Sequence, residues 1–414
     1  MTHSAPPDLS GQTILQIIPD LAAGGAERTT IEMAEAICNA GGQALVASAG
    51  GRLENDLRNA GGELIKMPLG RKNPISLWHN ARKLEQLIEQ REINLLHARS
   101  RAPGWSGLIA ARTANIPFIT TYHGAYSGKS ALKVYYNSVM ARGSHVIANS
   151  QWTADHLTAI HKIDPAIVTT IPRGIDLQTF SPDKVDGHRK QQIAQAWQLD
   201  KQSGKLIILL AGRLTSWKGQ LTAITAVSLL DREQQNRLHL VLAGDAQGRT
   251  SYVNALEQAI TANELHTAVS IVGHCDDIAA AYAVSDIILA PSVRPEAFGR
   301  VAAEASAMAK PVIISDHGGQ REIILDGQTG LSSKPGDAES LAGNLARLVA
   351  MSATERDAMG AAGQRYVRAR FTKENLQRAT LEVYQDALGA ALSVEPDKDN
   401  RHNAAGHGKI GDKP

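Results

Sequence analysis

The sequence has little cysteine and no long hydrophobic run. Cys38 and Cys275 are its two cysteines in 414 residues, and no Cys-x-x-Cys pair occurs. This argues against a disulfide scaffold or a thiolate zinc site and favours a reducing compartment. No apolar run reaches the ~18 residues that a membrane-spanning helix needs, and the first residues lack the basic start and apolar core of a signal peptide. We therefore expect a soluble, cytoplasmic protein whose membrane contact is peripheral, at the cytoplasmic face of the inner membrane.

Motifs of several enzyme classes are also missing. The dinucleotide fingerprint Gly-x-Gly-x-x-Gly is absent, which counts against an oxidoreductase with two dinucleotide folds. The chain has no His-Glu-x-x-His, no Cys/His cluster, no phosphate-binding P-loop and no Gly-x-Ser-x-Gly elbow. Asp397 and Asp399 have the spacing of a metal-binding pair but lie in a polar, glycine-rich tail. We expect no metal site there.

Charge is nearly balanced overall but uneven along the chain. The net charge is +2, which excludes the signature of a nucleic-acid partner, yet residues 65–142 hold 12 Lys/Arg against 3 Asp/Glu. A solvated face is one interpretation of this basic run. A patch for an anionic acceptor or an anionic membrane surface is the other.

Short apolar runs alternate with helical patterns, which is typical of βαβ units. The expected strands of a first unit are Thr13–Ile18, Gln43–Ala47, Glu63–Met67, Asn94–Ala98, Phe118–Tyr122, His145–Ala148 and Val168–Ile171. A second unit is expected to contain Lys205–Ala211, Leu238–Ala243, Val269–Val272, Asp286–Ala290 and Pro311–Ile314. The fold class is therefore α/β, with two Rossmann-like, doubly wound parallel sheets that face each other across a cleft.

The expected domain limits follow from composition. An N-terminal domain covers residues 1–186, and a long amphipathic helix is expected over 372–392. The C-terminal domain covers 200–371, after a polar entry segment, and residues 393–414 form a disordered tail.

One stretch carries the strongest functional signal: Pro295-Glu296-Ala297-Phe298-Gly299, followed by Glu304. It lies between apolar runs, which predicts the order strand, loop, helix, strand. The loop then lies at the carboxyl edge of a parallel sheet, where such sheets bind ligands. Glu296 and Glu304 are eight positions apart, at most roughly 12 Å along a helix. Two such carboxylates can hold hydroxyls at the two ends of one ligand.

Between these glutamates, the free N–H groups near Gly299 and Arg300 are expected to point outward with the positive end of a helix dipole. That arrangement is a ready site for phosphate. A sugar, a diphosphate and a ribose in a row fit this layout.

Glycines and cations follow other expected strands. Gly24-Gly25 opens the first helix and lets a ligand or the opposing domain approach the backbone, although a plain strand–helix turn explains the pair equally well. Arg213 and Lys218 lie in the loop after the first strand of the second unit, where they can bind a diphosphate or be solvated cations. His123 ends a strand and is expected to point into the cleft, although a lone histidine is more often structural.

The combination resembles the retaining glycosyltransferases of family 4, which have the GT-B architecture, and most of all those that build lipopolysaccharide and other cell-surface polysaccharides. The resemblance covers residues 12–390. It rests on Glu296 and Glu304 in their loop and helix, Arg213 and Lys218 in Gly-Arg-Leu-Thr-Ser-Trp-Lys-Gly, Gly24-Gly25, Arg173-Gly174-Ile175-Asp176 and Asp316-His317-Gly318-Gly319. Arg294 and Pro295 depart from the small or polar residues that are commoner before the first glutamate.

The resemblance implies catalytic roles for four side chains. Glu296 would hold the donor sugar's hydroxyls near the reacting carbon, and His123 would lie beside the anomeric carbon. Arg213 and Lys218 would neutralise the diphosphate as it leaves.

Donor binding is implied for further groups. Glu304 would bind the ribose hydroxyls. Backbone N–H groups of Phe298, Gly299 and Arg300 would hold the phosphates, and Gly24-Gly25 would close over them from the other domain. Family members need no cofactor and no metal for the transfer, so we expect none. The resemblance also implies that the helix over 372–392 crosses back and completes the N-terminal domain.

The implied reaction moves a sugar from a nucleoside-diphosphate donor to a glycan or lipid-linked acceptor with retention of anomeric configuration. We expect the acceptor to bear phosphate or carboxylate and to lie on the first domain, near Tyr122, Tyr126, Arg101, Lys129 and Lys133.

Two other hypotheses share this architecture. A nucleotide-sugar 2-epimerase would need further acid/base carboxylates, and the spacing of Glu296 and Glu304 argues against it. A catalytically silent scaffold would be favoured by loss of these glutamates, Arg213 or Lys218, and all four are present.

Overall fold

A computed structural model describes residues 7–22, 24–124, 130–199 and 204–393. Two residues predicted to bind the acceptor, Tyr126 and Lys129, lie outside the described residues, as does the tail from 394 onward with its Asp397 and Asp399.

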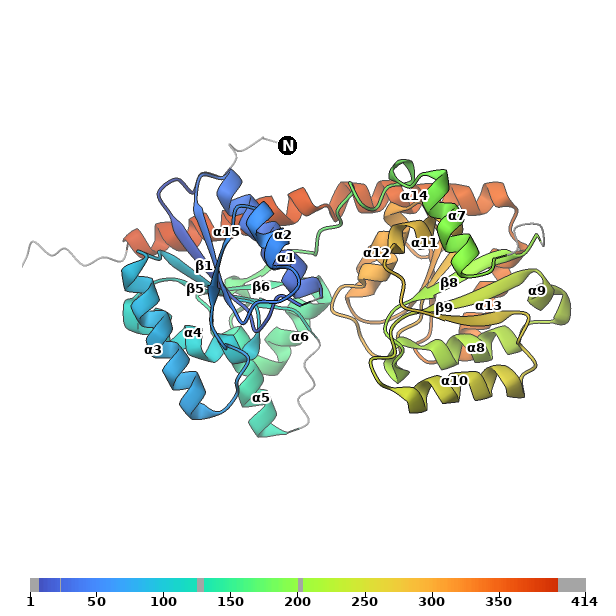
Figure 1. Cartoon of the computed structure of the whole chain (residues 1–414), viewed down its shortest axis with the longest axis horizontal. Helices are drawn as coiled ribbons and strands as arrows, with labels where there is room; N and C mark the ends of the chain where they lie inside the picture. The colour runs from blue at the N-terminus through green and yellow to red at the C-terminus, as the bar shows by residue number, and fades with distance from the viewer. Residues whose placement is uncertain (1–6, 23, 125–129, 200–203, 394–414) are drawn as a thin grey trace, which may run out of the picture.

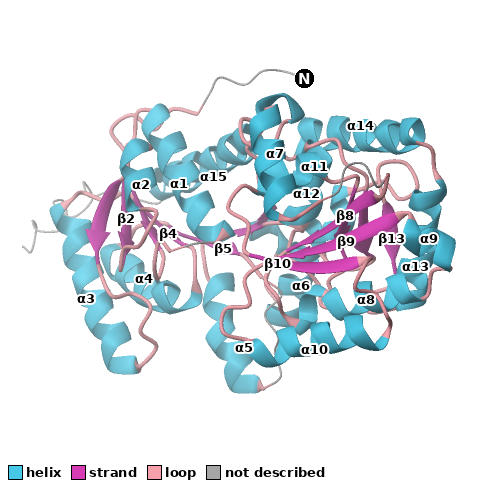
Figure 2. Ribbon diagram, turned by 45° about the vertical axis from the view of Figure 1, so that its right-hand side comes forward, coloured by secondary structure: helices cyan, strands magenta, loops and turns pink. Residues whose placement is uncertain are grey.

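The first unit is a parallel sheet with helices on both faces (Figures 1 and 2). Its described strands pair in the order β3-β2-β1-β4-β5-β6-β7. They are β1 (Thr13–Ile17), β2 (Gln43–Ser48), β3 (Glu63–Lys66), β4 (Leu95–Ala98), β5 (Phe118–Tyr122), β6 (His145–Ala148) and β7 (Val168–Thr170). The helices are α1 (Gly25–Asn39), α2 (Glu54–Asn59), α3 (Pro74–Gln90), α4 (Arg101–Ala114), α5 (Ala131–Asn137) and α6 (Gln151–His161).

The second unit repeats this plan with the described strand order β10-β9-β8-β11-β12-β13. Its strands are β8 (Leu206–Ala211), β9 (Leu238–Ala243), β10 (Val269–Gly273), β11 (Ile287–Ala290), β12 (Val312–Ser315) and β13 (Leu331–Ser333). Its helices are α7 (Gly187–Ala196), α8 (Gln220–Ser228), α9 (Arg232–Asn236), α10 (Thr250–Ala262), α11 (Ile278–Val284), α12 (Arg300–Ala307), α13 (Ala338–Ala350) and α14 (Ala353–Arg370).

These two sheets confirm the predicted fold class. The central strands are buried on both faces: β1, β5, β11 and β12 have no partly exposed residue. Their near-continuous apolar sequences follow from that double coverage, since helices pack on each side of a parallel sheet. β13 was not predicted from the sequence, because the segment Leu331–Ser333 is too short and too polar to be recognised as a strand.

Helix α15 (Lys373–Ser393) lies along α1 of the first unit (Figure 1). Its apolar residues, among them Leu381 and Tyr384, join the same buried cluster as Ile14 and Val46 of the first sheet. Buried His97 of β4 fixes the helix further, with 2.6 Å between its Nδ1 and the Tyr384 hydroxyl. Among the described helices, none combines the length and apolar character that crossing a bilayer requires.

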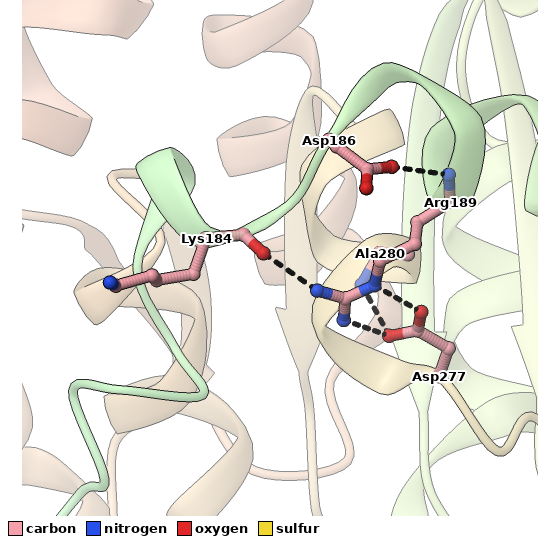
Figure 3. Close-up of polar contacts among 5 residues, drawn as sticks. All are labelled: Lys184, Asp186, Arg189, Asp277 and Ala280. Carbon is pink, nitrogen blue, oxygen red and sulfur yellow. Dashed lines mark hydrogen bonds and ion pairs between the residues drawn. The ribbon is translucent and has the colours of Figure 1, made fainter.

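The segment before β8 is anchored to the second unit by an ion pair (Figure 3). Arg189 of α7 donates two hydrogen bonds to the carboxylate of Asp277, at 2.7 and 2.6 Å, and a third to the carbonyl of Lys184 at 2.7 Å. Asp277 also caps α11 by accepting from the Ala280 amide. Hydrogen bonds from Arg189 hold the pKa of Asp277 below its ordinary value, so the pair is ionised at neutral pH.

Candidate active site

The predicted site residues follow the carboxyl ends of strands in both sheets. In the first sheet, Gly24-Gly25 comes after β1 and His123 directly after β5. In the second, Arg213 and Lys218 follow β8, and Glu296 follows β11. Because carboxyl ends of parallel strands share one edge, each sheet presents its set on a single side. Hydrogen bonds of Gln151, Trp152 and Thr153 in the first unit to Glu322 and Ala297 in the second place these edges against each other.

Glu296 is held by a lysine and a serine of the second unit. Its Oε1 accepts a hydrogen bond from Lys218 Nζ at 2.6 Å and another from the Ser292 hydroxyl. Both charged side chains are largely buried, with 13% of Lys218 and 16% of Glu296 exposed. Burial raises the pKa of Glu296, but the Lys218 charge and both hydrogen bonds lower it, and the net direction is downward. Glu296 is therefore a fixed carboxylate.

Glu304 is buried one turn into α12, with 7% of the residue exposed. Its Oε1 accepts from Arg300 at 2.8 Å, and its Oε2 accepts from the Tyr282 hydroxyl at 3.1 Å. The Glu304 charge raises the pKa of Arg300. Burial, reinforced by Glu304, also raises the pKa of Tyr282. Arg300 and Tyr282 thus orient the carboxylate, and both of them stay protonated at neutral pH.

The turn between the glutamates requires glycine. Gly299 has φ 99° and precedes α12 as its N-cap, with no side chain capping the helix. A Cβ at this position would lie 2.5 Å from the Cβ of Gln320. Phe298 is buried against Phe371, with ring centroids 5.6 Å apart. The first amide groups of α12 thus remain available for an anion beside Glu296.

Arg173 of the first unit lies beside Gly25, where Arg300 of the second unit also approaches. A Cβ on Gly25 would come within 1.8 Å of the Arg173 guanidinium, and Cδ of Arg300 lies 3.4 Å from the same point. A side chain at Gly25 would therefore displace the Arg173 guanidinium from its present position. Burial, and then the nearby Arg300 charge, lowers the pKa of Arg173 to about 10, so it remains a cation at neutral pH.

His123 has one ring nitrogen occupied and one unused. Arg173 donates to its Nδ1 at 3.2 Å, and because a guanidinium can only donate, the ring carries its proton on Nε2. Within the described residues, that buried Nε2 has no hydrogen-bond partner. Burial and the charges of Arg173 and Arg99 hold the pKa of His123 well below its ordinary value. The ring is a neutral hydrogen-bond donor, which suits a ligand oxygen.

The two units also meet at the N-terminus of α6. The carboxylate of Glu322, in the second unit, accepts hydrogen bonds from the amides of Gln151 and Trp152 at 3.0 and 2.9 Å. The buried hydroxyl of Thr153 donates to the carbonyl of Ala297 at 3.1 Å. The first unit therefore binds directly to the loop that carries Glu296.

Not every predicted residue lies at this junction. Tyr122 is fully buried in the core of the first unit, so the prediction that it contacts an acceptor is wrong; both faces of β5 are buried, and the ring packs into one of the two clusters. Arg101 donates to the Asn137 side chain at 2.9 Å. Lys133 is exposed on α5, and Arg213 is exposed with its guanidinium 5.9 Å from the ring of Trp217.

Other parts of the described chain offer weaker alternatives for a site. A cavity of about 380 Å³ lies at the amino ends of β1 and β2, lined by Gly11, Gln12, Thr13, Cys38, Gly41, Gly42, Gln43, Ala44 and Gly61, and it contains none of the predicted residues. No group of three or more His, Cys, Asp or Glu side chains that could hold a metal ion occurs among the described residues.

Sequence reasoning missed several residues of the junction. No role was predicted for Ser292, Tyr282, Thr153 and Glu322. The partners of the last three lie on other elements, whereas Ser292 contacts Glu296 within the same loop. Arg173 had a weak signal, since it follows the last strand of the first unit.

Comparison with known proteins covers both units. Residues 23–179 match the model described as Glycosyltransferase Family 4, and residues 191–366 match Glycosyl transferases group 1. A glycosyltransferase from Rickettsia africae ESF-5 superposes with a TM-score of 0.83 at 32% identity, covering 91% of this chain and 98% of that one. The D-inositol 3-phosphate glycosyltransferase of Jonesia denitrificans is 28% identical over 315 residues, which are 72% of this chain and 73% of the relative. Anabaena HepE, in complex with UDP and glucose, has a TM-score of 0.77 at 23% identity, covering 91% of this chain and 100% of its own.

Proposed function

The chain belongs to glycosyltransferase family 4, and we propose that it transfers a hexose from a uridine-diphosphate donor to an acceptor that carries an anionic group. It is a retaining glycosyltransferase that uses nucleotide-sugar donors. The base, the acceptor and the pathway are the proposed part. The observation that carries the proposal is the pair Glu296 and Glu304, which flank the open N-terminus of α12 and are each held by a cation.

The donor would lie across α12. Glu304, oriented by Arg300 and Tyr282, accepts hydrogen bonds from the ribose hydroxyls, and the first backbone N–H groups of α12 donate to the phosphate oxygens. Glu296 accepts hydroxyls of the sugar. UDP is the proposed carrier because HepE, which has the same fold, is known in complex with UDP and glucose.

Departure of the diphosphate concentrates negative charge near Lys218 and Arg213. Lys218 has three N–H donors, so it can hold Glu296 and still donate to phosphate oxygens. Exposed Arg213 can move onto the diphosphate. Lys218, which Glu296 already holds in place, stabilises the leaving group without reorganisation, which lowers the barrier. No metal or cofactor is assigned a step.

The first unit completes the site. The Nε2–H of His123 donates to an oxygen of the donor sugar, and Gly24-Gly25 brings the N-terminus of α1 toward the phosphates. In this role His123 positions the sugar and exchanges no proton, because its ring stays neutral.

We place the acceptor on the first unit and the reaction in the synthesis of lipopolysaccharide or another surface polysaccharide. Two observations support an anionic acceptor: the basic run over residues 65–142, and the inositol phosphate in the name of a relative. Arg101 and Lys133 are the described residues of the earlier acceptor prediction that remain candidates.

The test is a transfer assay with UDP-glucose, UDP-galactose and UDP-N-acetylglucosamine against inositol 3-phosphate and lipid-linked glycans. The proposal predicts acceptor-dependent release of UDP and, by NMR, an anomeric configuration equal to that of the donor. Failure to release UDP from any of these donors in the presence of any acceptor would contradict it.

A further inference from the structure

The four most exposed large apolar side chains among the described residues lie on two helices of the first unit. Ile75 and Trp78 of α3 are 82% and 58% exposed, and Leu132 and Tyr135 of α5 are 79% and 57% exposed. In a water-soluble domain, scattered apolar residues are ordinary, but a group of the largest ones on one side marks a surface that binds something.

Helix α4 lies against both of these helices. The Ser106 hydroxyl of α4 donates to the carbonyl of Leu77 in α3 at 3.0 Å. The Trp105 indole of α4 donates to the carbonyl of Tyr136 in α5 at 3.0 Å. In Figures 1 and 2, α3 and α5 extend to the same lower end of the first unit. We call this the α3–α5 surface, defined by Ile75, Trp78, Leu132 and Tyr135.

The surroundings of the α3–α5 surface are basic. No Asp or Glu occurs between Glu92 and Asp155, which includes all of α4 and α5. Exposed cations on and beside the three helices are Arg71, Lys72, Arg82, Lys83, Arg112, Lys133 and Arg142. Such a field attracts an anionic partner.

Cations and aromatic rings are also paired here. The guanidinium of Arg82 lies 5.5 Å from the ring centroid of Trp78. The guanidinium of Arg142 lies 5.2 Å from Tyr135 and 5.3 Å from Trp105. Trp and Tyr favour the boundary between headgroups and acyl chains, and Arg beside them can reach lipid phosphates.

We propose that the α3–α5 surface binds the anionic lipid surface of a membrane, with its apolar side chains inserted at the headgroup level. An anionic bilayer is the partner that matches both features at once, since it offers phosphate to the cations and hydrocarbon to Ile75, Trp78 and Leu132. This inference rests on the proposed function, because docking would bring the site between the two units close to acceptors that are anchored in the membrane.

The experiment is sedimentation of the full chain with vesicles of phosphatidylcholine alone or with about one third phosphatidylglycerol. Wild type is expected to sediment with the anionic vesicles and to be released as salt rises. The double variant Trp78→Ser/Leu132→Ser should lower the partition coefficient about tenfold or more, since two large apolar side chains are lost from the contact. Leu229→Ser is the matched control, because Leu229 is 51% exposed in the second unit.

Three outcomes would overturn the proposal. The first is absence of wild type from the anionic pellet, and the second is a loss of binding in Leu229→Ser as large as that in the double variant. The third is a second copy of the chain on this surface, which analytical ultracentrifugation without lipid would show as a dimer that the double variant abolishes. Sugar transfer to a soluble acceptor should be unchanged in the double variant, so failure of membrane binding and failure of the proposed function are separate results.

Discussion

At the scale of single residues, the site depends on protonation states that the fold sets. Lys218 and Ser292 keep Glu296 ionised, and burial with Arg173 keeps His123 neutral. A carboxylate that accepts and a ring that donates can bind a polyhydroxylated ligand from two sides. No proton needs to move between these two side chains during the reaction.

His123→Ala should lower kcat/KM about tenfold, the effect of removing one neutral hydrogen bond to the substrate. The pH profile of the wild type should show no step from this ring between about pH 6 and 8, because its pKa is far below that window. Steady-state kinetics would check both. His145→Ala is the control, since His145 also has a buried ring nitrogen without a partner among the described residues but begins β6 at the other edge of the sheet. A step near neutral pH that disappears in His123→Ala would contradict the neutral assignment.

At the scale of elements, the N-terminus of α6 is the contact that couples the units. Glu322 neutralises its positive dipole end and satisfies two of its free amides. Thr153, one position further along, holds the carbonyl beside Glu296. The geometry of the donor loop therefore depends on closure of the first unit onto the second.

Glu322→Ala should raise the donor KM by roughly threefold to tenfold, because losing a charged helix cap costs about 1 kcal/mol. Glu322→Gln should raise the donor KM less than Glu322→Ala does, since its amide oxygen can still accept a hydrogen bond. Small-angle scattering should show a larger radius of gyration for Glu322→Ala. Glu339→Ala removes an exposed carboxylate from the first turn of α13 and should change neither quantity. If Glu322→Ala lowered thermal stability but left the radius of gyration unchanged, Glu322 would not control closure of the two units, and this account would be contradicted.

Helix α15 should make the stability of the first unit depend on pH. Burial holds the pKa of His97, which contacts Tyr384, well below its value in the unfolded chain. The His97 ring therefore binds a proton in the unfolded state but not in the folded state. As a result, the free energy of unfolding falls as pH drops below about 6.5. One such group contributes at most about 1.4 kcal/mol per pH unit. Urea unfolding of wild type and His97→Gln between about pH 7.5 and 5.5 should show a shallower slope in the variant; equal slopes would contradict this account.

At the scale of the whole molecule, the sequence was sufficient for the fold and for part of the site. Strand positions agreed within about two residues, because buried parallel strands leave uninterrupted apolar runs. Residues that share one loop and helix, such as Glu296 and Glu304, could be placed together from their spacing. The contact of Glu322 with α6 could not be predicted from the sequence, since it joins residues about 170 positions apart and depends on how one unit closes on the other. The prediction for Tyr122 failed for a local reason: helices cover both faces of β5, so a position at the end of this strand does not expose the side chain.

The central claim is that the α12 loop and helix bind a nucleoside diphosphate, and titration calorimetry tests it most directly. UDP, GDP, ADP, CMP and NAD would be titrated into wild type, Glu304→Gln and the control Glu339→Ala. We predict binding of UDP at roughly micromolar Kd, weakened about tenfold or more in Glu304→Gln because the ribose loses its charged acceptor, and unchanged in Glu339→Ala. Binding of NAD alone, binding of none of these nucleotides, or equal affinity in Glu304→Gln would contradict the account.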